Sequence, residues 1–242
     1  MEQATRKHLE DLNRRFYGRH GESFSASRAG PWPSFELALA GLTRPPEQVL
    51  DLGCGNGRLL SALRGKGRRT LEYTGVDLSA ELLEIAAARH PEACLLRLDL
   101  LSEPGTSGDA LPSGPFDLVA ALGLLHHVPG FETRQRLLRR AALRVGPGGV
   151  LWVSFWRYDR DPRFATRKRP PQSAGLEGSE LERGDVILGF GQDPEALRYC
   201  HMVDDAEVER LLEPFSAWEH RAFCADGAGG RLNDHWLLTR RS

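Results

Sequence analysis

The stretch Val49-Leu-Asp-Leu-Gly-Cys-Gly-Asn-Gly-Arg58 decides the fold. An apolar run ends in three alternate glycines, Gly53, Gly55 and Gly57, and a helix-like segment follows them. Glycine permits sharp turns and lets a backbone approach a ligand closely. A strand, a glycine turn and a helix that starts at the turn therefore predict a nucleotide-binding turn of an α/β fold.

Strand-like and helix-like segments alternate outward from this turn, which predicts parallel strands with right-handed crossovers. We expect strands over 48–52, 71–76, 94–98, 116–122 and 150–155, and helices over 57–63, 80–89 and 132–145. Two later segments, 215–223 and 231–239, suit a closing antiparallel pair. The expected fold class is α/β and Rossmann-like: a mostly parallel seven-stranded sheet with an antiparallel C-terminal strand and helices on both faces.

The 242 residues fit a single domain with four parts. We expect a helical cap in 1–46, a ligand-binding core in 47–155, a mobile insertion over the active-site edge in 156–190, and the substrate-side part of the sheet in 191–242. The insertion is charged, contains Pro and Gly and lacks periodicity, which is typical of loops. Asp204 and Glu207 have the spacing of a capping box before a helix over 205–212.

The composition limits the possible partners and compartment. A formal net charge of −1 gives no overall attraction to nucleic acid, so RNA binding would need a local patch. The first residues lack the apolar stretch of a signal peptide, and no apolar run is long enough to span a membrane. We therefore expect a cytoplasmic protein with neither a membrane nor DNA as a partner. The four scattered cysteines indicate reduced thiols rather than a disulfide framework or a zinc motif.

Asp51 distinguishes between the ligands that a glycine turn can hold. It lies two residues before Gly53, and Arg58 occupies the position where dinucleotide-binding turns carry a third glycine. A carboxylate there would repel a pyrophosphate, whereas it would attract a ligand with an ammonium and a sulfonium group. S-adenosyl-L-methionine (SAM) carries both groups.

Two further aspartates end the next two predicted strands. Asp77 follows Gly75 and Val76, where a carboxylate accepts the protons of both ribose hydroxyls, and Asp99 is expected to receive the adenine amino group. Asp77 alone fits a dinucleotide or SAM, but together with Asp51 it favours SAM. The alternative is that these aspartates only cap the helices that follow them.

The core resembles the class I SAM-dependent methyltransferases from about Gln48 to Phe155. The resemblance includes Phe116-Asp-Leu-Val-Ala-Ala-Leu-Gly-Leu-Leu-His126-His127 and Leu143-Arg-Val-Gly-Pro-Gly-Gly149. It implies SAM as methyl donor and S-adenosyl-L-homocysteine as product. The positions expected to touch the cofactor are Arg28, Trp32, Asp51, Gly53, Cys54, Gly55, Asn56, Asp77, Leu78, Asp99, Leu100 and Ala121. Arg28 could instead be a surface residue, and Trp32 could instead fill space in the hydrophobic core.

The flanking segments resemble a narrower family, the tRNA wobble-uridine carboxymethyl methyltransferases, which include the fungal enzyme and the methyltransferase domain of the animal AlkB-homologue fusion. Phe24-Ser-Ala-Ser-Arg-Ala-Gly-Pro-Trp-Pro33 is similar to the family's N-terminal motif, with Ser27 in place of the usual threonine. Gly184-Asp-Val186 and Arg198-Tyr-Cys-His201 are similar to its C-terminal segments, although Cys200 departs from the pattern. The resemblance implies tRNA and a small zinc-binding activator protein as partners.

An acceptor of this kind is a carboxylate, which is ionised at neutral pH and needs no general base. Arg198, Tyr199 and His201 are the expected catalytic residues because such donors can orient a carboxylate. Tyr199 and His201 share one face of a strand, which we interpret as the active-site face; the alternative is that both are packed scaffold residues. Arginines and Lys168 between 157 and 169 are the candidate RNA patch, unless they form a solvated loop.

His126 is a further catalytic candidate, as a base for a hydroxyl or amine acceptor. We expect its neighbour His127 to be buried and structural. Adjacent histidines on a strand end should point apart, so no metal site is expected. Two alternative functions stay open: a small-molecule O- or N-methyltransferase, and a SAM-binding scaffold or activator subunit without turnover.

Overall fold

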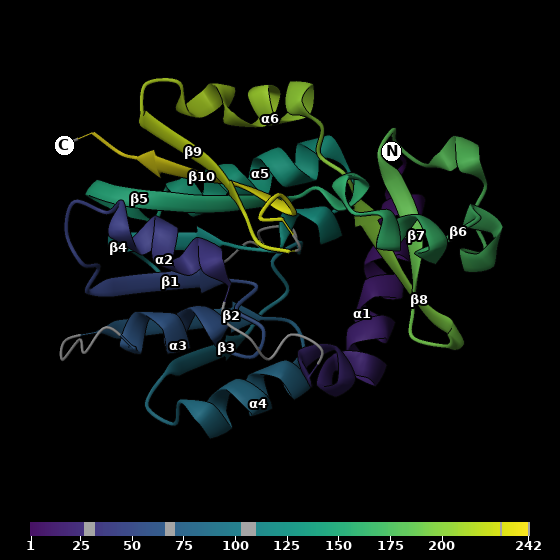
Figure 1. Ribbon diagram of the computed structural model, residues 1–242, viewed down its shortest axis with the longest axis horizontal. Helices are drawn as coiled ribbons and strands as arrows, with labels where there is room; N and C mark the ends of the chain where they lie inside the picture. The colour runs from purple at the N-terminus through teal and green to yellow at the C-terminus, as the bar shows by residue number, and fades with distance from the viewer. Residues whose placement is uncertain (27–31, 66–70, 103–109, 228, 242) are drawn as a thin grey trace.

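The computed structural model describes residues 1–26, 32–65, 71–102, 110–227 and 229–241. Its central sheet has seven strands in the order β3-β2-β1-β4-β5-β10-β9 (Figure 1). These strands are β1 (Gln48–Leu52), β2 (Glu72–Asp77), β3 (Cys94–Arg97), β4 (Phe116–Ala121), β5 (Val145–Trp156), β9 (Glu219–Ala225) and β10 (Asn233–Thr239). The first five are parallel, and β10 runs antiparallel to both β5 and β9. The predicted fold class is confirmed.

Helices cover both faces of this sheet because its strands are apolar on both sides. Leu50 and Leu52 share one core cluster with α5 (Phe131–Ala142) and α6 (Asp205–Leu212), while Val49 shares another with α2 (Pro33–Ala40), α3 (Arg58–Arg64) and α4 (Ala80–Arg89). The alternation along β1 therefore places Asp51 on the side of α2 and α3.

The predicted cap of α6 is present, but the predicted capping box is incomplete and β5 begins earlier than predicted. Asp204 caps α6 by accepting a hydrogen bond from the Glu207 backbone N–H at 2.9 Å. The reciprocal half of the capping box is not formed, because the Glu207 carboxylate bonds to Arg134 and His201 instead. The segment 145–149 belongs to β5, so this strand begins before the predicted bound of 150.

A second sheet of three strands, β6-β7-β8, was not expected from the sequence. It consists of β6 (Lys168–Arg169), β7 (Asp185–Phe190) and β8 (Asp193–His201), preceded or interrupted by the 3-10 turns η2 (Tyr158–Arg160), η3 (Pro162–Arg167), η4 (Pro171–Ala174) and η5 (Gly178–Glu180). Segment 156–190 is thus built of defined turns and strands, and β8 lies outside the main sheet to which 191–242 was assigned.

The long helix α1 (Gln3–Ala26) packs on this small sheet, and together they form a cap beside the central sheet (Figure 1). Leu9 and Leu12 of α1 are buried against Ile187, Leu197 and Tyr199 of β7 and β8. The remaining 3-10 turns are η1 (Leu125–His127), after β4, and η6 (Glu213–Phe215), after α6. Among the described residues, no helix is long and apolar enough to cross a membrane.

Candidate active site

A cavity of about 770 Å³ lies where the parallel strands of the central sheet end. The glycine turn after β1, the end of β2 and the loop after β4 line it from the core, and α1, η3 and β8 line it from the cap. Ligands of open α/β sheets bind at this edge, and the volume is within the usual range of about 300–1,000 Å³ for small-molecule sites. The cap and the core therefore share one site.

The glycine turn after β1 has the conformation that its sequence predicts. Gly53, Gly55 and Gly57 have φ angles of 73°, 53° and 78°, a region that glycine enters without strain. The Gly53 and Cys54 backbone N–H groups donate to the Val76 carbonyl at 2.8 and 3.1 Å, which ties the turn to β2. A Cβ at Gly53 would make a tight contact of 3.1 Å with the Leu124 side chain.

Asp51 is buried at 3% exposure and lines the cavity. The described residues give its carboxylate one hydrogen-bond donor, the Tyr73 hydroxyl at 2.7 Å. Burial raises its pKa to about 7, although the bond from Tyr73 opposes the shift. Asp51 caps no helix, because α3 begins at Gly57 and Arg58. A buried carboxylate with this pKa is stabilised in its ionised form by a cationic ligand.

Asp77 holds the glycine turn and faces the cavity. One carboxylate oxygen accepts from the Gly55 N–H and the other from the Ser79 N–H, both at 2.9 Å. A carboxylate has about four acceptor positions, so two stay available for ribose hydroxyls. Burial raises its pKa, while these backbone bonds lower it. The side chain that caps α4 is Ser79, so the helix-capping alternative does not account for Asp77.

Asp99 lies at the outer rim of the same cavity. Its oxygens accept from the Leu101 N–H and from Arg14 of α1, both at 3.0 Å. The contact with Arg14 is an exposed ion pair that joins the cap to the end of β3. Asp99 thus lies at the strand end where the sequence placed it, and it also connects the two layers.

The remaining predicted cofactor positions divide into three groups. Cys54, Asn56, Leu78, Leu100 and Trp32 line the cavity. Ala121 does not: it ends β4 at 1% exposure, and the next residue, Leu122, lines the cavity in its place. Arg28 lies outside the described residues. Trp32 lies beneath the Arg58 guanidinium at 4.8 Å and packs on Phe35 at 5.6 Å, so it combines the lining and core roles.

The donor set fits SAM. The buried carboxylate of Asp51, the half-buried carboxylate of Asp77, a turn of three glycines with positive φ and apolar side chains surround one cavity. Asp51 suits the cationic methionine end, Asp77 suits the ribose, and Leu78 and Leu100 supply apolar contacts for a flat base. A cation removes the electrostatic penalty of burying Asp51 in its ionised form.

Arg198 is the cavity residue that stands out on the cap side. Its side chain is 2% exposed, and its Nε and Nη1 atoms are buried without a hydrogen-bond partner among the described residues. Three aromatic rings surround the guanidinium, with centroids 5.1 Å (Phe24), 5.4 Å (Trp156) and 5.5 Å (Phe16) from its Cζ. Aromatic faces attract a cation but supply no acceptor atoms for its N–H groups.

Tyr199 and His201 do share one face of β8, as predicted, but it is not the cavity face. Both bond to one oxygen of Asp185, the Tyr199 hydroxyl at 2.7 Å and His201 Nδ1 at 2.6 Å. His201 Nε2 lies 2.8 Å from Glu207, which in turn accepts from Arg134. The interpretation that this face points into the active site is therefore wrong; alternation places Arg198 and Cys200 on the opposite face.

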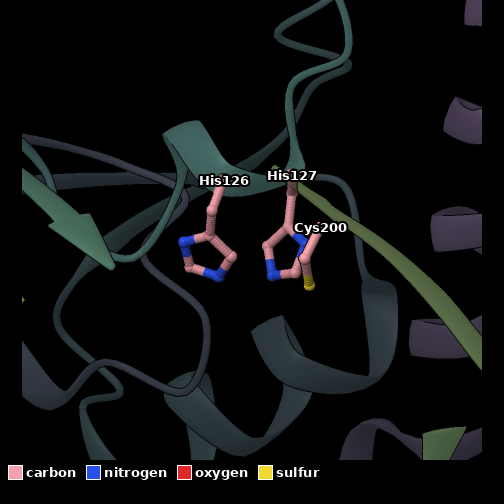
Figure 2. A group of neighbouring side chains, drawn as sticks. All are labelled: His126, His127 and Cys200. Carbon is pink, nitrogen blue, oxygen red and sulfur yellow. The ribbon is translucent and has the colours of Figure 1, made fainter. Parts of the chain in front are cut away.

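His126 and His127 differ from expectation in burial and direction. His126 is the more buried of the two, at 8% exposure, and both line the cavity. They lie on the 3-10 turn η1 rather than on a strand, so their side chains do not alternate. The rings are side by side, with centroids 4.0 Å apart and the Cys200 sulfur next to them (Figure 2). The prediction that they point apart is wrong.

Many cations of the predicted RNA patch have partners within the protein. Arg157 and Arg160 bond to Asp234, and Arg163 bonds to Asp161. Arg167 lies over the Phe164 ring and Lys168 over the Tyr158 ring. Arg169 donates to the carbonyls of 166 and 168. Arg163 and Arg167 also line the cavity.

Sequence reasoning missed several site residues. Asn13 and Tyr17 of α1 reach His127, the Tyr17 hydroxyl at 2.7 Å from its Nε2. Asp226 lines the cavity and accepts hydrogen bonds from the Ser34 N–H and from Asn233. The bond from Ser34 connects the start of α2 to the loop after β9. The one signal in the sequence is the aromatic pair Phe16 and Tyr17.

Comparisons with known proteins agree with this geometry. A family described as "Methyltransferase domain" matches residues 50–151. The chain is 31% identical over 159 residues to a ubiquinone biosynthesis O-methyltransferase of Albidiferax ferrireducens, covering 64% of this chain and 58% of that one. It is 28% identical over 155 residues to a tRNA (carboxymethyluridine(34)-5-O)-methyltransferase of Xenopus tropicalis, covering 64% of this chain and 22% of that one.

A solved structure supports the fold. The SAM-dependent methyltransferase of Clostridium acetobutylicum superposes with a TM-score of 0.63 at 13% identity, covering 93% of this chain and 99% of that one. The matches to the two curated relatives span less than two thirds of their lengths. The sheet order, the carboxylates around the glycine turn and these relatives lead to one conclusion: the chain carries a class I SAM-dependent methyltransferase domain, with SAM as its methyl donor.

Proposed function

We propose that the chain methylates a carboxylate, namely that of a carboxymethylated wobble uridine in tRNA, to give a methyl ester. The observation that carries this proposal is Arg198, a buried guanidinium that lines the cofactor cavity and whose Nε and Nη1 atoms have no hydrogen-bond acceptor among the described residues. A buried charge is costly unless an opposite charge pairs with it. A carboxylate is the partner that matches the planar guanidinium with two parallel hydrogen bonds.

The surroundings of Arg198 favour a planar acceptor. Trp156 and Phe24 lie on the guanidinium, and Phe164 and Phe190 also line the cavity. Aromatic side chains are the usual surfaces on which an unstacked base is held. A carboxymethylated pyrimidine supplies both a flat ring for these side chains and a carboxylate for Arg198.

The chemistry needs orientation more than proton transfer. Bound SAM supplies an electrophilic methyl group on a sulfonium. A carboxylate is already ionised at neutral pH, so His126 need not remove a proton from it. Arg198 orients the acceptor through two hydrogen bonds, one to each oxygen, and each oxygen keeps a further lone pair. The cap excludes water from the oxygen that faces the methyl group, and this oxygen attacks. The new O–CH₃ bond forms as the S–CH₃ bond breaks, and the electron pair of that bond stays on sulfur.

The flanking segments support the same acceptor. Arg198 and Asp185 belong to the C-terminal motifs that resemble the wobble-uridine carboxymethyl methyltransferases, and the Xenopus tropicalis relative carries that activity in its name. The region around Phe24 resembles the family's N-terminal motif, and Phe24 contacts Arg198. Two motifs that are far apart in the sequence thus meet at the proposed acceptor site.

The test compares Arg198→Lys and Arg198→Ala with a matched control, Arg139→Ala, which removes an exposed arginine from α5. Each protein is assayed with SAM and tRNA that carries carboxymethyluridine, and nucleoside mass spectrometry detects the ester. We expect the Arg198 variants to lose methyl transfer while SAM binding stays, because the lost contact is to the acceptor. Lysine should rescue poorly, since it lacks the bidentate geometry.

A small-molecule O-methyltransferase is the second candidate, favoured by the ubiquinone biosynthesis relative and by the net charge of −1. It predicts methylation of a phenolic metabolite at a rate that does not depend on tRNA. Turnover of such a compound together with no ester on carboxymethylated tRNA would replace the proposal. SAM binding without turnover of either class of acceptor would favour a scaffold.

A further inference from the structure

Three side chains of kinds that bind metals converge at the cavity, two in its wall and one buried behind it. His126, His127 and Cys200 each offer one ligand atom, and these three atoms lie within 4.8 Å of one another. Figure 2 shows the two imidazole rings side by side, with the thiol next to the His127 ring. Two imidazoles and a thiolate are a donor set that zinc prefers over harder cations such as Mg²⁺ or Ca²⁺.

The backbone holds these residues in place from two directions. His126 and His127 lie on the turn η1 between β4 and α5, and the His126 ring packs on Trp156 with centroids 4.9 Å apart. Cys200 lies in β8, paired with Val186 of β7, and is fully buried. The set therefore joins the core to the cap, and a metal there would connect the two layers.

The hydrogen bonds of His127 indicate its tautomer. Its Nδ1 lies 3.2 Å from the Tyr199 carbonyl and 3.5 Å from the Asn13 amide nitrogen. The shorter contact is to an oxygen that can only accept, so we assign the proton to Nδ1. Nε2 then keeps its lone pair, which accepts from the Tyr17 hydroxyl at 2.7 Å. Metal-binding histidines usually donate their other N–H to a carbonyl or carboxylate in this way, which fixes the ring and its tautomer.

We propose that His126, His127 and Cys200 bind one Zn²⁺, a site that goes beyond the proposed methyl transfer and does not rest on it. Typical Zn–N and Zn–S distances are about 2.0–2.1 and 2.3 Å, so the three side chains close in by small rotations. The Cys200 thiol releases its proton to solvent, and the Tyr17 hydroxyl gives up its bond to Nε2.

A three-ligand site keeps a fourth position for water or a small ligand. Because His126 and His127 both line the cavity, that position faces the cavity rather than the core. Zn²⁺ bound to one thiolate has a net charge of +1. Arg198 is also positive, so the two charges repel each other, and an anion in the cavity would offset both.

The test uses the whole chain after treatment with a chelator. Zn²⁺ is titrated in competition with a chromophoric chelator, and Co²⁺ is added in a separate experiment, because thiolate-bound Co²⁺ has a charge-transfer band in the near ultraviolet. The variants are Cys200→Ser and His127→Gln. The matched control is Cys94→Ser, which removes an exposed thiol on β3 instead.

We expect one Zn²⁺ per chain, a charge-transfer band with Co²⁺, and an increase in the unfolding temperature with Zn²⁺. All three should be lost in Cys200→Ser and kept in Cys94→Ser, and His127→Gln should weaken zinc at least tenfold. A band that survives Cys200→Ser, or Co²⁺ that binds without any band, overturns the site. The latter result would point to Glu182, Asp185 and His201, a second cluster in the described part of the chain that has no thiol.

Discussion

Single residues decide what the cavity can hold, and Asp51 does so through its protonation. Its pKa of about 7 is raised chiefly by burial. A carboxyl with a raised pKa is neutral below that pH when no ligand is bound, and a cationic ligand favours the ionised form. Below pH 7, SAM must therefore displace a proton from Asp51 as it binds.

The affinity for SAM should accordingly rise with pH between 6 and 8. Well below the pKa, it should change by up to about tenfold per pH unit, because one proton is linked to binding. Calorimetry at three pH values, in buffers with different ionisation enthalpies, measures both the affinity and the proton released. Asp51→Asn should bind SAM more weakly, and its affinity for SAM should depend much less on pH. Any pH dependence that remains is assigned to Asp77. An affinity that is flat across this range in the wild type would contradict the assignment.

The sequence could predict the aspartates of the site but not the face of β8. Asp51 and Asp77 follow apolar runs, and the ends of parallel strands meet at one edge, so their convergence follows from the order of elements. Arg198, Tyr199, Cys200 and His201 only alternate, and alternation defines two faces without saying which one meets the ligand. That choice depends on where α1 packs, a tertiary contact to which no local pattern points.

At the scale of elements, a buried polar network connects the cap to the core. Asp185 of β7 accepts hydrogen bonds from Tyr199 and His201 of β8. The Nε2 atom of His201 is hydrogen-bonded to Glu207 of α6. Arg134 of α5 completes it by donating to Glu207. The turn η1 illustrates the same limit of sequence reasoning. The predicted strand over 116–122 indicated that the two histidines lie at a strand end, whereas a 3-10 turn brings their rings together.

This network predicts that Tyr199→Phe affects stability rather than catalysis. The change removes one buried hydrogen bond to Asp185, and we expect it to lower the free energy of unfolding by about 1–3 kcal/mol. kcat and KM should stay close to those of the wild type, since Tyr199 does not line the cavity. Urea unfolding and steady-state kinetics on the same preparation measure both effects. Arg198→Ala should show the opposite pattern, and a loss of kcat in Tyr199→Phe at full stability would restore a catalytic role.

For the whole molecule, the remaining question is how a chain of net charge −1 would hold tRNA. Arg157, Arg160 and Arg163 form ion pairs with aspartates. Their guanidinium groups are therefore less able to bind the phosphates of RNA. Helix α1 offers a different surface. Lys7, Arg15 and Arg19 are exposed on it and form no ion pair among the described residues, and the neighbouring side of the helix lines the cavity.

We therefore expect the α1 cations to contribute more to tRNA binding than the paired arginines of the cap. Each lysine or arginine that contacts a phosphate contributes about 0.7–0.9 to the slope of log affinity against log salt. Reversing Arg15 and Arg19 to glutamate should weaken tRNA binding and reduce that slope by more than one. The matched control, Arg139→Glu, changes an exposed arginine near the end of α5, and this helix runs back from the cavity edge to the start of β5.

Fluorescence anisotropy with labelled tRNA over a range of KCl concentrations measures both quantities. SAM binding should be unchanged in the double variant, because Arg15 and Arg19 do not line the cofactor cavity. Methylation of a free carboxymethylated nucleoside should also persist, which separates the docking of RNA from the chemistry at Arg198. If the double variant and Arg139→Glu have the same slope as the wild type, α1 is a solvated face and the RNA lies elsewhere on the molecule.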